Sequence, residues 1–146
     1  MATDASDFDI EIMARTVYGE ARGESRTTQL GVAAAMVNRH KAGKWFSGET
    51  LAECCAMHAA GNKYGQFSCW NVFDPNYSQM FRVDENNLIL VQCRGCVNEA
   101  LGEAPQDDIV RGATHYANLN VCDPDWVDSA TKTVTIGKLT FFKDVN

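Results

Sequence analysis

The segment LGVAAAMVNR (residues 30–39) constrains the fold of this chain more than any other part of it. These residues are apolar on nearly every face of the helix that they predict. Such a helix cannot lie on the surface, because its apolar side chains would then meet water. We therefore expect a central helix, capped by Thr27 or Thr28 and enclosed by the other elements.

Further helices are predicted around this central one. Ser6 is followed three residues later by Asp9, which is typical of a helix start, and helical spacing continues to about Glu20. The run Thr50-Leu51-Ala52-Glu53 resembles a capping box and predicts a short third helix. Another helix is expected from a cap at Asp84 to Gly102.

The rest of the chain predicts a long loop and a small β-region. Glycines, Pro75 and several asparagines indicate irregular structure over residues 61–82, and long loops are often functional. Residues 114–118 alternate weakly, and residues 133–136 and 139–142 form a hairpin pattern around Gly137-Lys138. The sequence therefore predicts one mainly helical α+β domain over residues 1–146, with a groove between its lobes.

Charge and hydropathy exclude several function classes. The net charge is −6 and the pI is about 4.9, so a nucleic-acid partner is not expected. No apolar run approaches the ~18 residues of a membrane span, so membrane insertion is not expected either. Residues 1–7 are acidic and polar, without the pattern of a secretory signal, which predicts synthesis and initial retention in the cytoplasm.

The cysteines point to buried thiols more than to a metal site. Cys93 and Cys96 form a C-x-x-C inside a helical pattern, and the adjacent Cys54 and Cys55 lack the spacing of a second zinc-ligand pair. We therefore expect no metal and no cofactor. Six cysteines allow 15 pairings, and the sequence leaves open whether any disulfide forms.

Glu20 is the strongest acid–base candidate. It follows an apolar run and a glycine at the end of a predicted helix, and a carboxyl half sheltered by apolar neighbours can donate a proton at neutral pH. An ion pair with Arg15 or Arg22 is the alternative explanation. Glu24 lies one turn further on and either shares this face or is merely solvated.

Other chemistry has weaker support in the sequence. Ser68 lacks the G-x-S-x-G pattern of a serine nucleophile, while a cysteine nucleophile, Cys69 with His115, stays open. Aromatic and amide side chains suited to sugar rings gather in the loop and β-region, although the large aromatics could equally belong to the core. They are Gln66, Phe67, Trp70, Asn71, Tyr116, Asn118 and Trp126.

Six segments together resemble the cell-wall hydrolase family of the spore-cortex-lytic type, which is also common among phage endolysins. They are ARTVYGEARGE (residues 14–24), GVAAAMVNR (31–39), QFSCWN (66–71), GATHYAN (112–118), PDW (124–126) and IGKLTFF (136–142). They follow the family order over about residues 10–142. The resemblance implies a fold related to lysozyme-like lytic transglycosylases and cleavage of the β-1,4 bond between N-acetylmuramic acid and N-acetylglucosamine in peptidoglycan.

The resemblance also assigns roles. Glu20 occupies the position of the catalytic glutamate, and one carboxyl suffices for a lytic transglycosylase, whose product is a 1,6-anhydro sugar. Substrate contacts are expected from Glu24, Gln66, Phe67, Ser68, Trp70, Tyr116 and Asn118. Tyr116 is expected to bind Glu20 or the intermediate.

Two alternatives to a one-glutamate lytic transglycosylase stay open. A hydrolytic muramidase would need a second carboxylate, from Glu24, Asp74, Asp123 or Asp125. A glycan-binding virion module would need none. As a compact phage lysis enzyme, the protein is expected to be a monomer that reaches the wall from the host cytoplasm through a holin-type lesion.

Overall fold

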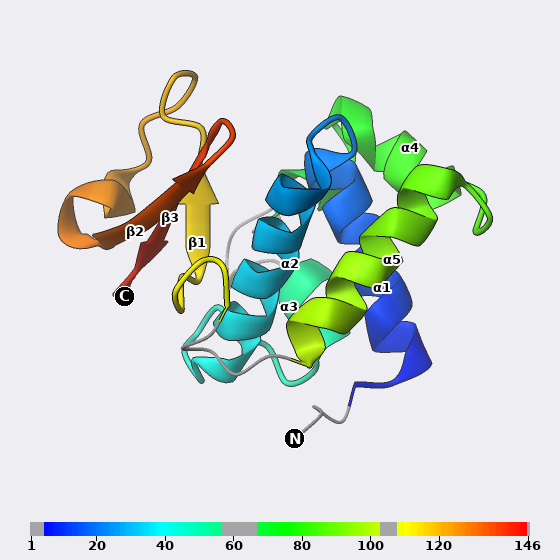
Figure 1. The fold of residues 1–146 in the computed structure, drawn as a ribbon, viewed down its shortest axis with the longest axis horizontal. Helices are drawn as coiled ribbons and strands as arrows, with labels where there is room; N and C mark the ends of the chain where they lie inside the picture. Colours follow the sequence, from blue (N-terminus) through cyan, green and yellow to red (C-terminus); the bar gives the residue numbers. More distant parts are fainter. Residues whose placement is uncertain (1–4, 57–66, 103–107, 146) are drawn as a thin grey trace.

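The computed structural model describes residues 5–56, 67–102 and 108–145, and it has a helical body with a small sheet beside it (Figure 1). The helical body contains α1 (Asp7–Ala21), α2 (Arg26–Lys41), α3 (Leu51–Ala56), α4 (Pro75–Arg82) and α5 (Leu88–Leu101). The sheet contains β1 (His115–Ala117), β2 (Thr131–Ile136) and β3 (Leu139–Lys143). This confirms the predicted α+β class with its excess of helix.

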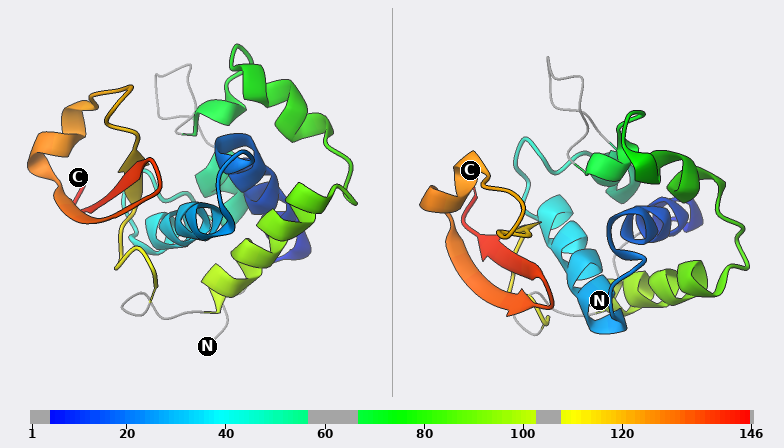
Figure 2. Two further views of the ribbon diagram at one scale, coloured as in Figure 1. Left: turned by 45° about the horizontal axis from the view of Figure 1, so that its top comes forward. Right: turned by 90° about the horizontal axis from the view of Figure 1, so that it is seen from above.

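Helix α2 is the centre of the molecule, as the sequence predicts. All residues from Thr28 to Arg39 are buried. Helices α1, α3 and α5 pack on one side of α2, and β1 and β2 pack on the other (Figures 1 and 2). The prediction of Thr27 or Thr28 as the cap is wrong, because α2 begins earlier: Ser25 has an extended backbone and its hydroxyl accepts from the Thr28 N–H.

Helix α1 ends where the sequence predicts, and it carries Glu20 in its last turn. At its start, Ser6 and Asp9 form a reciprocal capping box, with both N···O distances at 3.1 Å. Asp9 also accepts from the Ala52 N–H at 3.0 Å, which ties the start of α3 to α1. One local cap therefore also fixes the position of a second helix.

The expected loop over residues 61–82 is wrong for its last part. Pro75 does not break structure here but is the first residue of α4, where its missing N–H costs no hydrogen bond. Asp74 caps this helix by accepting from the Asn76 N–H at 2.8 Å. The cap of α5 is Asn87 and not Asp84, whose side chain instead accepts from the Asn86 N–H in the preceding turn.

The three strands form an antiparallel sheet in the order β1-β3-β2. The predicted hairpin is confirmed, with Gly137 in the left-handed region (φ 58°) at the turn between β2 and β3. Strand β1 pairs with the other edge of β3, so that Tyr116 lies opposite Phe141. This pairing brings Tyr116 to the side of the sheet that faces the helical body.

Within the described residues, no helix is long and apolar enough to cross a membrane. All six cysteines are free thiols, five of them buried and Cys122 exposed. The C-x-x-C lies inside α5, as expected from its helical pattern.

Gly19 allows a close approach between α1 and the segment around Cys69. A Cβ placed on Gly19 would lie 2.7 Å from the Cys69 Cβ and 3.1 Å from the Met80 Cβ. We predict that Gly19→Ala lowers the free energy of unfolding by about 1–3 kcal/mol, measured by urea denaturation, because the core is overpacked.

Gly95→Ala is the matched control for this prediction. Gly95 also lies in a helix, but a Cβ there meets nothing within 4 Å. Removing a mid-helix glycine should leave stability unchanged or raise it by up to about 1 kcal/mol. Equal effects of the two substitutions would contradict the packing argument.

Candidate active site

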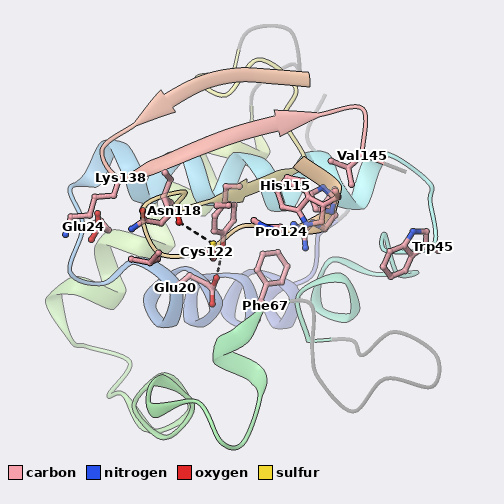
Figure 3. Close-up of a pocket in the computed structure, with 16 residues that line it drawn as sticks. Glu20, Glu24, Trp45, Phe67, His115, Asn118, Cys122, Pro124, Lys138 and Val145 are labelled. Atoms are coloured by element: carbon pink, nitrogen blue, oxygen red, sulfur yellow. Dashed lines mark hydrogen bonds between the residues drawn. The ribbon is translucent and has the colours of Figure 1, made fainter. Parts of the chain in front are cut away.

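A pocket of about 670 Å³ contains Glu20 and is walled by residues of the helical body and of the sheet region (Figure 3). Glu20 lies near its middle, Trp45 at one end, and Glu24 with Lys138 at the other. The described lining residues are Glu20, Glu24, Arg39, Trp45, Phe67, His115, Tyr116, Ala117, Asn118, Val121, Cys122, Pro124, Trp126, Lys138, Leu139 and Val145. The predicted groove between lobes is therefore present.

Glu20 is held by groups from two distant parts of the chain. Its Oε1 accepts from the Tyr116 hydroxyl at 2.6 Å, and its Oε2 accepts from the Cys69 N–H at 3.2 Å. Within the described part of the chain, the alternative ion pairs do not form: Arg15 pairs with Glu11 at 2.8 Å, and Arg22 donates to the Asn76 Oδ1 at 2.6 Å. These two donors to the Glu20 carboxyl are both neutral groups.

Tyr116 can form a hydrogen bond with Glu20 whether the Glu20 carboxyl is ionised or protonated. Its ring packs against Phe67 and Phe141, with centroids 6.4 and 5.7 Å away. Burial, and then the nearby Glu20 carboxylate, raise the pKa of Tyr116 well above its ordinary value. The hydroxyl therefore keeps its proton, and it can donate to a carboxylate or accept from a carboxylic acid.

The short turn η1 (Ser68–Trp70) positions the second donor to Glu20. The Trp70 indole N–H donates to the Thr16 hydroxyl at 2.9 Å, which fixes η1 against α1. Trp70 thus packs beside the core and is not among the described residues that line the pocket. Phe67, in contrast, is buried in the core and also lines the pocket. Gln66 and the Ser68 side chain lie outside the described part of the chain.

Two other expected substrate contacts, Glu24 and Asn118, line the pocket. Glu24 lies at its end beside Lys138, away from Glu20 (Figure 3). Among the described lining residues, Glu20 and Glu24 are the two carboxylates. The other candidates, Asp74, Asp123 and Asp125, do not belong to this lining set.

Several residues that line the pocket have no binding role predicted from the sequence. Arg39 lies in the last turn of α2, where His40 and Lys41 follow it, and basic residues are common at helix ends, so its burial carries no clear sequence signal. Trp45 is 62% exposed at the end of the pocket, and nothing in its sequence neighbourhood indicates this. Val121 and Cys122 follow Asn118 in an irregular segment without a motif.

The arrangement disfavours Cys69 and His115 as a catalytic pair. Burial, and then Glu20, raise the pKa of the Cys69 thiol far above its ordinary value, and its Sγ–H points to the Thr16 carbonyl at 3.8 Å. His115 has its Nδ1 2.8 Å from the Thr114 hydroxyl. Burial, and then the Arg39 charge, lower the pKa of His115 to about 3. The thiol therefore does not tend to ionise, and this histidine is too weak a base to activate it.

Across the described residues, no group of three or more His, Cys, Asp or Glu side chains gathers in a way that could hold a metal ion.

Comparisons with known proteins agree with this geometry. The sequence model of the Cell Wall Hydrolase family matches residues 23–142. A spore cortex-lytic enzyme from Halalkalibacterium halodurans is 31% identical over 137 residues, covering 93% of this chain. This chain spans only 35% of that relative's length.

Two solved structures have the same fold. The catalytic domain of the germination-specific lytic transglycosylase SleB from Bacillus anthracis superposes with a TM-score of 0.71 at 24% identity, covering 98% of this chain and 100% of that domain. The catalytic domain of the Bacillus cereus SleB protein gives a TM-score of 0.67 at 24% identity, covering 97% of this chain and 94% of that domain.

The burial of the cysteines predicts selective labelling. Native protein treated with iodoacetamide should gain one carbamidomethyl group, on Cys122, because the other five thiols are buried. Mass spectrometry of the intact protein and of its peptides measures this. The Cys122→Ser protein should gain none under the same conditions. Rapid labelling of Cys69 in either protein would contradict its assignment as an inert thiol.

Proposed function

Because this chain belongs to the Cell Wall Hydrolase family, we propose that it cleaves peptidoglycan as a lytic transglycosylase, with Glu20 as its single catalytic acid and base. The observation that carries the proposal is the position of Glu20, in the middle of the pocket and oriented by Tyr116 and the Cys69 N–H. Glu20 lies outside the matched residues 23–142, so its role rests on this geometry and on the motif around it.

In the first proposed step, the Glu20 carboxyl protonates the glycosidic oxygen between N-acetylmuramic acid and N-acetylglucosamine. The bond from the muramyl C1 to this oxygen breaks, and positive charge develops at C1. Glu20 becomes a carboxylate as the proton leaves. Tyr116 and the Cys69 N–H then stabilise the new negative charge by donating to its two oxygens.

In the second proposed step, the Glu20 carboxylate removes the proton from the C6 hydroxyl of the same muramyl residue. The C6 oxygen forms a bond to C1, which gives the 1,6-anhydro product and returns Glu20 to its acid form. No water is consumed, so a second carboxylate is not needed to activate one.

The position of Glu24 favours this route over hydrolysis. A two-carboxylate hydrolase places its carboxyls on either side of the bond that breaks. Glu24 instead lies at the end of the pocket beside Lys138, while Glu20 lies in the middle (Figure 3). We propose that Glu24 contacts a distal part of the glycan.

The pocket walls suit a glycan strand. Half-buried Trp126 and exposed Trp45 offer apolar faces to sugar rings, and Asn118 adds an amide for hydroxyl or acetamido groups. The spore cortex-lytic relative and the lytic-transglycosylase domain with the same fold support this substrate class. We propose that the monomer is the active form.

Replacing Glu20 by glutamine should reduce lysis of purified peptidoglycan by about 100-fold or more, because the amide cannot transfer the proton. Turbidity loss of a cell-wall suspension measures the rate. Glu24→Gln is the matched control and should keep most of the activity. The proposal is wrong if the Glu20→Gln protein is as active as the wild type, or if only the Glu24→Gln protein is inactive.

The products should carry 1,6-anhydro-muramyl ends. Mass spectrometry of the soluble muropeptides distinguishes the routes, since the anhydro product is lighter than the hydrolytic product by one water. Reducing muramyl ends would indicate a hydrolytic muramidase in its place. Release of free peptides alone would contradict any glycosidase activity.

A further inference from the structure

Arg39 is a buried cation in the wall of the catalytic pocket. It lies near the carboxyl-terminal end of α2, is only 5% exposed, and lines the pocket together with Phe67 and Tyr116. The function proposed above gives it no role. Buried arginines normally pair with a carboxylate, because removing an isolated charge from water is costly.

The described part of the chain supplies no such carboxylate. The Arg39 Nε donates to the Thr114 carbonyl at 2.9 Å, and the guanidinium carbon lies 4.4 Å from the Phe67 ring centroid. No carboxylate of the described residues lies within ion-pair distance of Arg39, and its two terminal nitrogens donate no hydrogen bond to these residues. The Phe46 ring centroid lies further away, at 6.0 Å. Toward the described residues, one edge of the guanidinium is therefore anchored, aromatic rings pack against it, and its outer N–H donors are unused.

Glu20 does not form an ion pair with Arg39. Burial lowers the pKa of Arg39, while Tyr116, two buried thiols and Glu20 act in the opposite direction. The guanidinium remains charged, because its ordinary pKa is far above neutrality. The chain contains 19 Asp and Glu residues, yet none of those that the structure describes pairs with Arg39.

We propose that Arg39 binds the lactyl oxygens of N-acetylmuramic acid and so selects a muramyl over an N-acetylglucosaminyl residue beside Glu20. The proposal rests on the function proposed above and names the recognition element within that site. The two sugars differ only in the 3-O-lactyl substituent, which ends in a carboxylate in peptide-free strands and in an amide carbonyl where a stem peptide is attached.

The geometry of the guanidinium fits this substituent. Its planar fork of N–H donors matches a carboxylate in a bidentate pair, and a carbonyl oxygen accepts from it as well. Phe67 and the Thr114 carbonyl fix its plane before the ligand arrives. The lactyl group is short and attached directly to the sugar ring, so its oxygens can reach a buried donor in the pocket wall. The terminal carboxylate of a stem peptide lies further from the ring and is not positioned to do so.

The other pocket cation is a natural control. Lys138 is exposed and lies at the end of the pocket beside Glu24 (Figure 3). Its charge is therefore screened by solvent. A general attraction of anions would depend on both cations, whereas recognition of the lactyl group should depend on Arg39 alone.

Binding to the Glu20→Gln protein tests the proposal without turnover. Isothermal titration calorimetry compares three tetrasaccharides. The first contains only N-acetylglucosamine. The second alternates N-acetylglucosamine with peptide-free N-acetylmuramic acid, and the third is the second with its lactyl carboxylates converted to amides. The tetrasaccharide with free lactyl carboxylates should bind at least about tenfold more tightly than the one made only of N-acetylglucosamine, because a charge-assisted pair is added. The affinity of the amidated tetrasaccharide should lie between these two. Equal binding of all three would overturn the inference but leave the proposed function standing.

Second substitutions in the Glu20→Gln background assign this preference to its residue. Arg39→Gln should abolish the preference for muramyl glycans. Arg39→Lys should keep part of the preference for the free lactyl carboxylate and lose the preference for the lactyl amide. Lys138→Gln should leave both preferences unchanged. Thermal unfolding checks that each protein is folded; if Arg39→Gln is not, the Arg39→Lys protein and the ligand series decide. An undiminished preference in folded Arg39→Gln contradicts the inference. Binding of no glycan at all contradicts the proposed function and the inference with it.

Discussion

The polar end of helix α2 holds the two halves of the molecule together. Most of α2 is apolar and packs into the helical body, but Asn38 and Arg39 near its end donate to the strand side of the molecule. Asn38 Nδ2 donates to Asp108 at 2.9 Å and to the Ala113 carbonyl at 3.0 Å, and the Arg39 Nε donates to the Thr114 carbonyl. These buried hydrogen bonds fix the backbone just before β1, and Tyr116 follows two residues later. The position of Tyr116 over Glu20 therefore depends on the register of one helix end.

The same dependence explains why the site is only partly visible in the sequence. The motif around Glu20 indicates its sheltered position, and local patterns predict the Ser6 cap, the buried helix and the hairpin. The two described donors to Glu20 lie 49 and 96 residues away in the chain, and no local rule predicts such contacts. Family resemblance indicates Tyr116, but the backbone N–H of Cys69 carries no sequence signal, since every residue except proline has one.

The wrong loop prediction at Pro75 has a physical cause, which is that a residue type acts differently at different positions. Pro75 suggests a break in structure because it cannot donate, yet the first residue of a helix needs no donor. The sequence leaves open whether Trp70 contacts substrate or belongs to the core; in the structure it packs beside the core, and its N–H donates to the Thr16 hydroxyl. Arg39 stands beside His40 and Lys41 at the end of α2, where a basic residue suggests a solvated helix end, yet its side chain is buried.

The charge balance of the pocket links Arg39 to the proposed chemistry. In the mechanism proposed above, cleavage by Glu20 would develop positive charge at the muramyl C1, and a fixed cation in the same pocket would oppose it. A lactyl carboxylate bound to Arg39, as we propose, would neutralise that cation when the substrate binds, and a lactyl carbonyl oxygen would place a partial negative charge beside it. Tyr116 stays neutral throughout, since burial holds its proton. Under this arrangement the pocket has a favourable field for the transition state only when a muramyl residue occupies it, so binding selectivity and catalytic selectivity have the same physical origin.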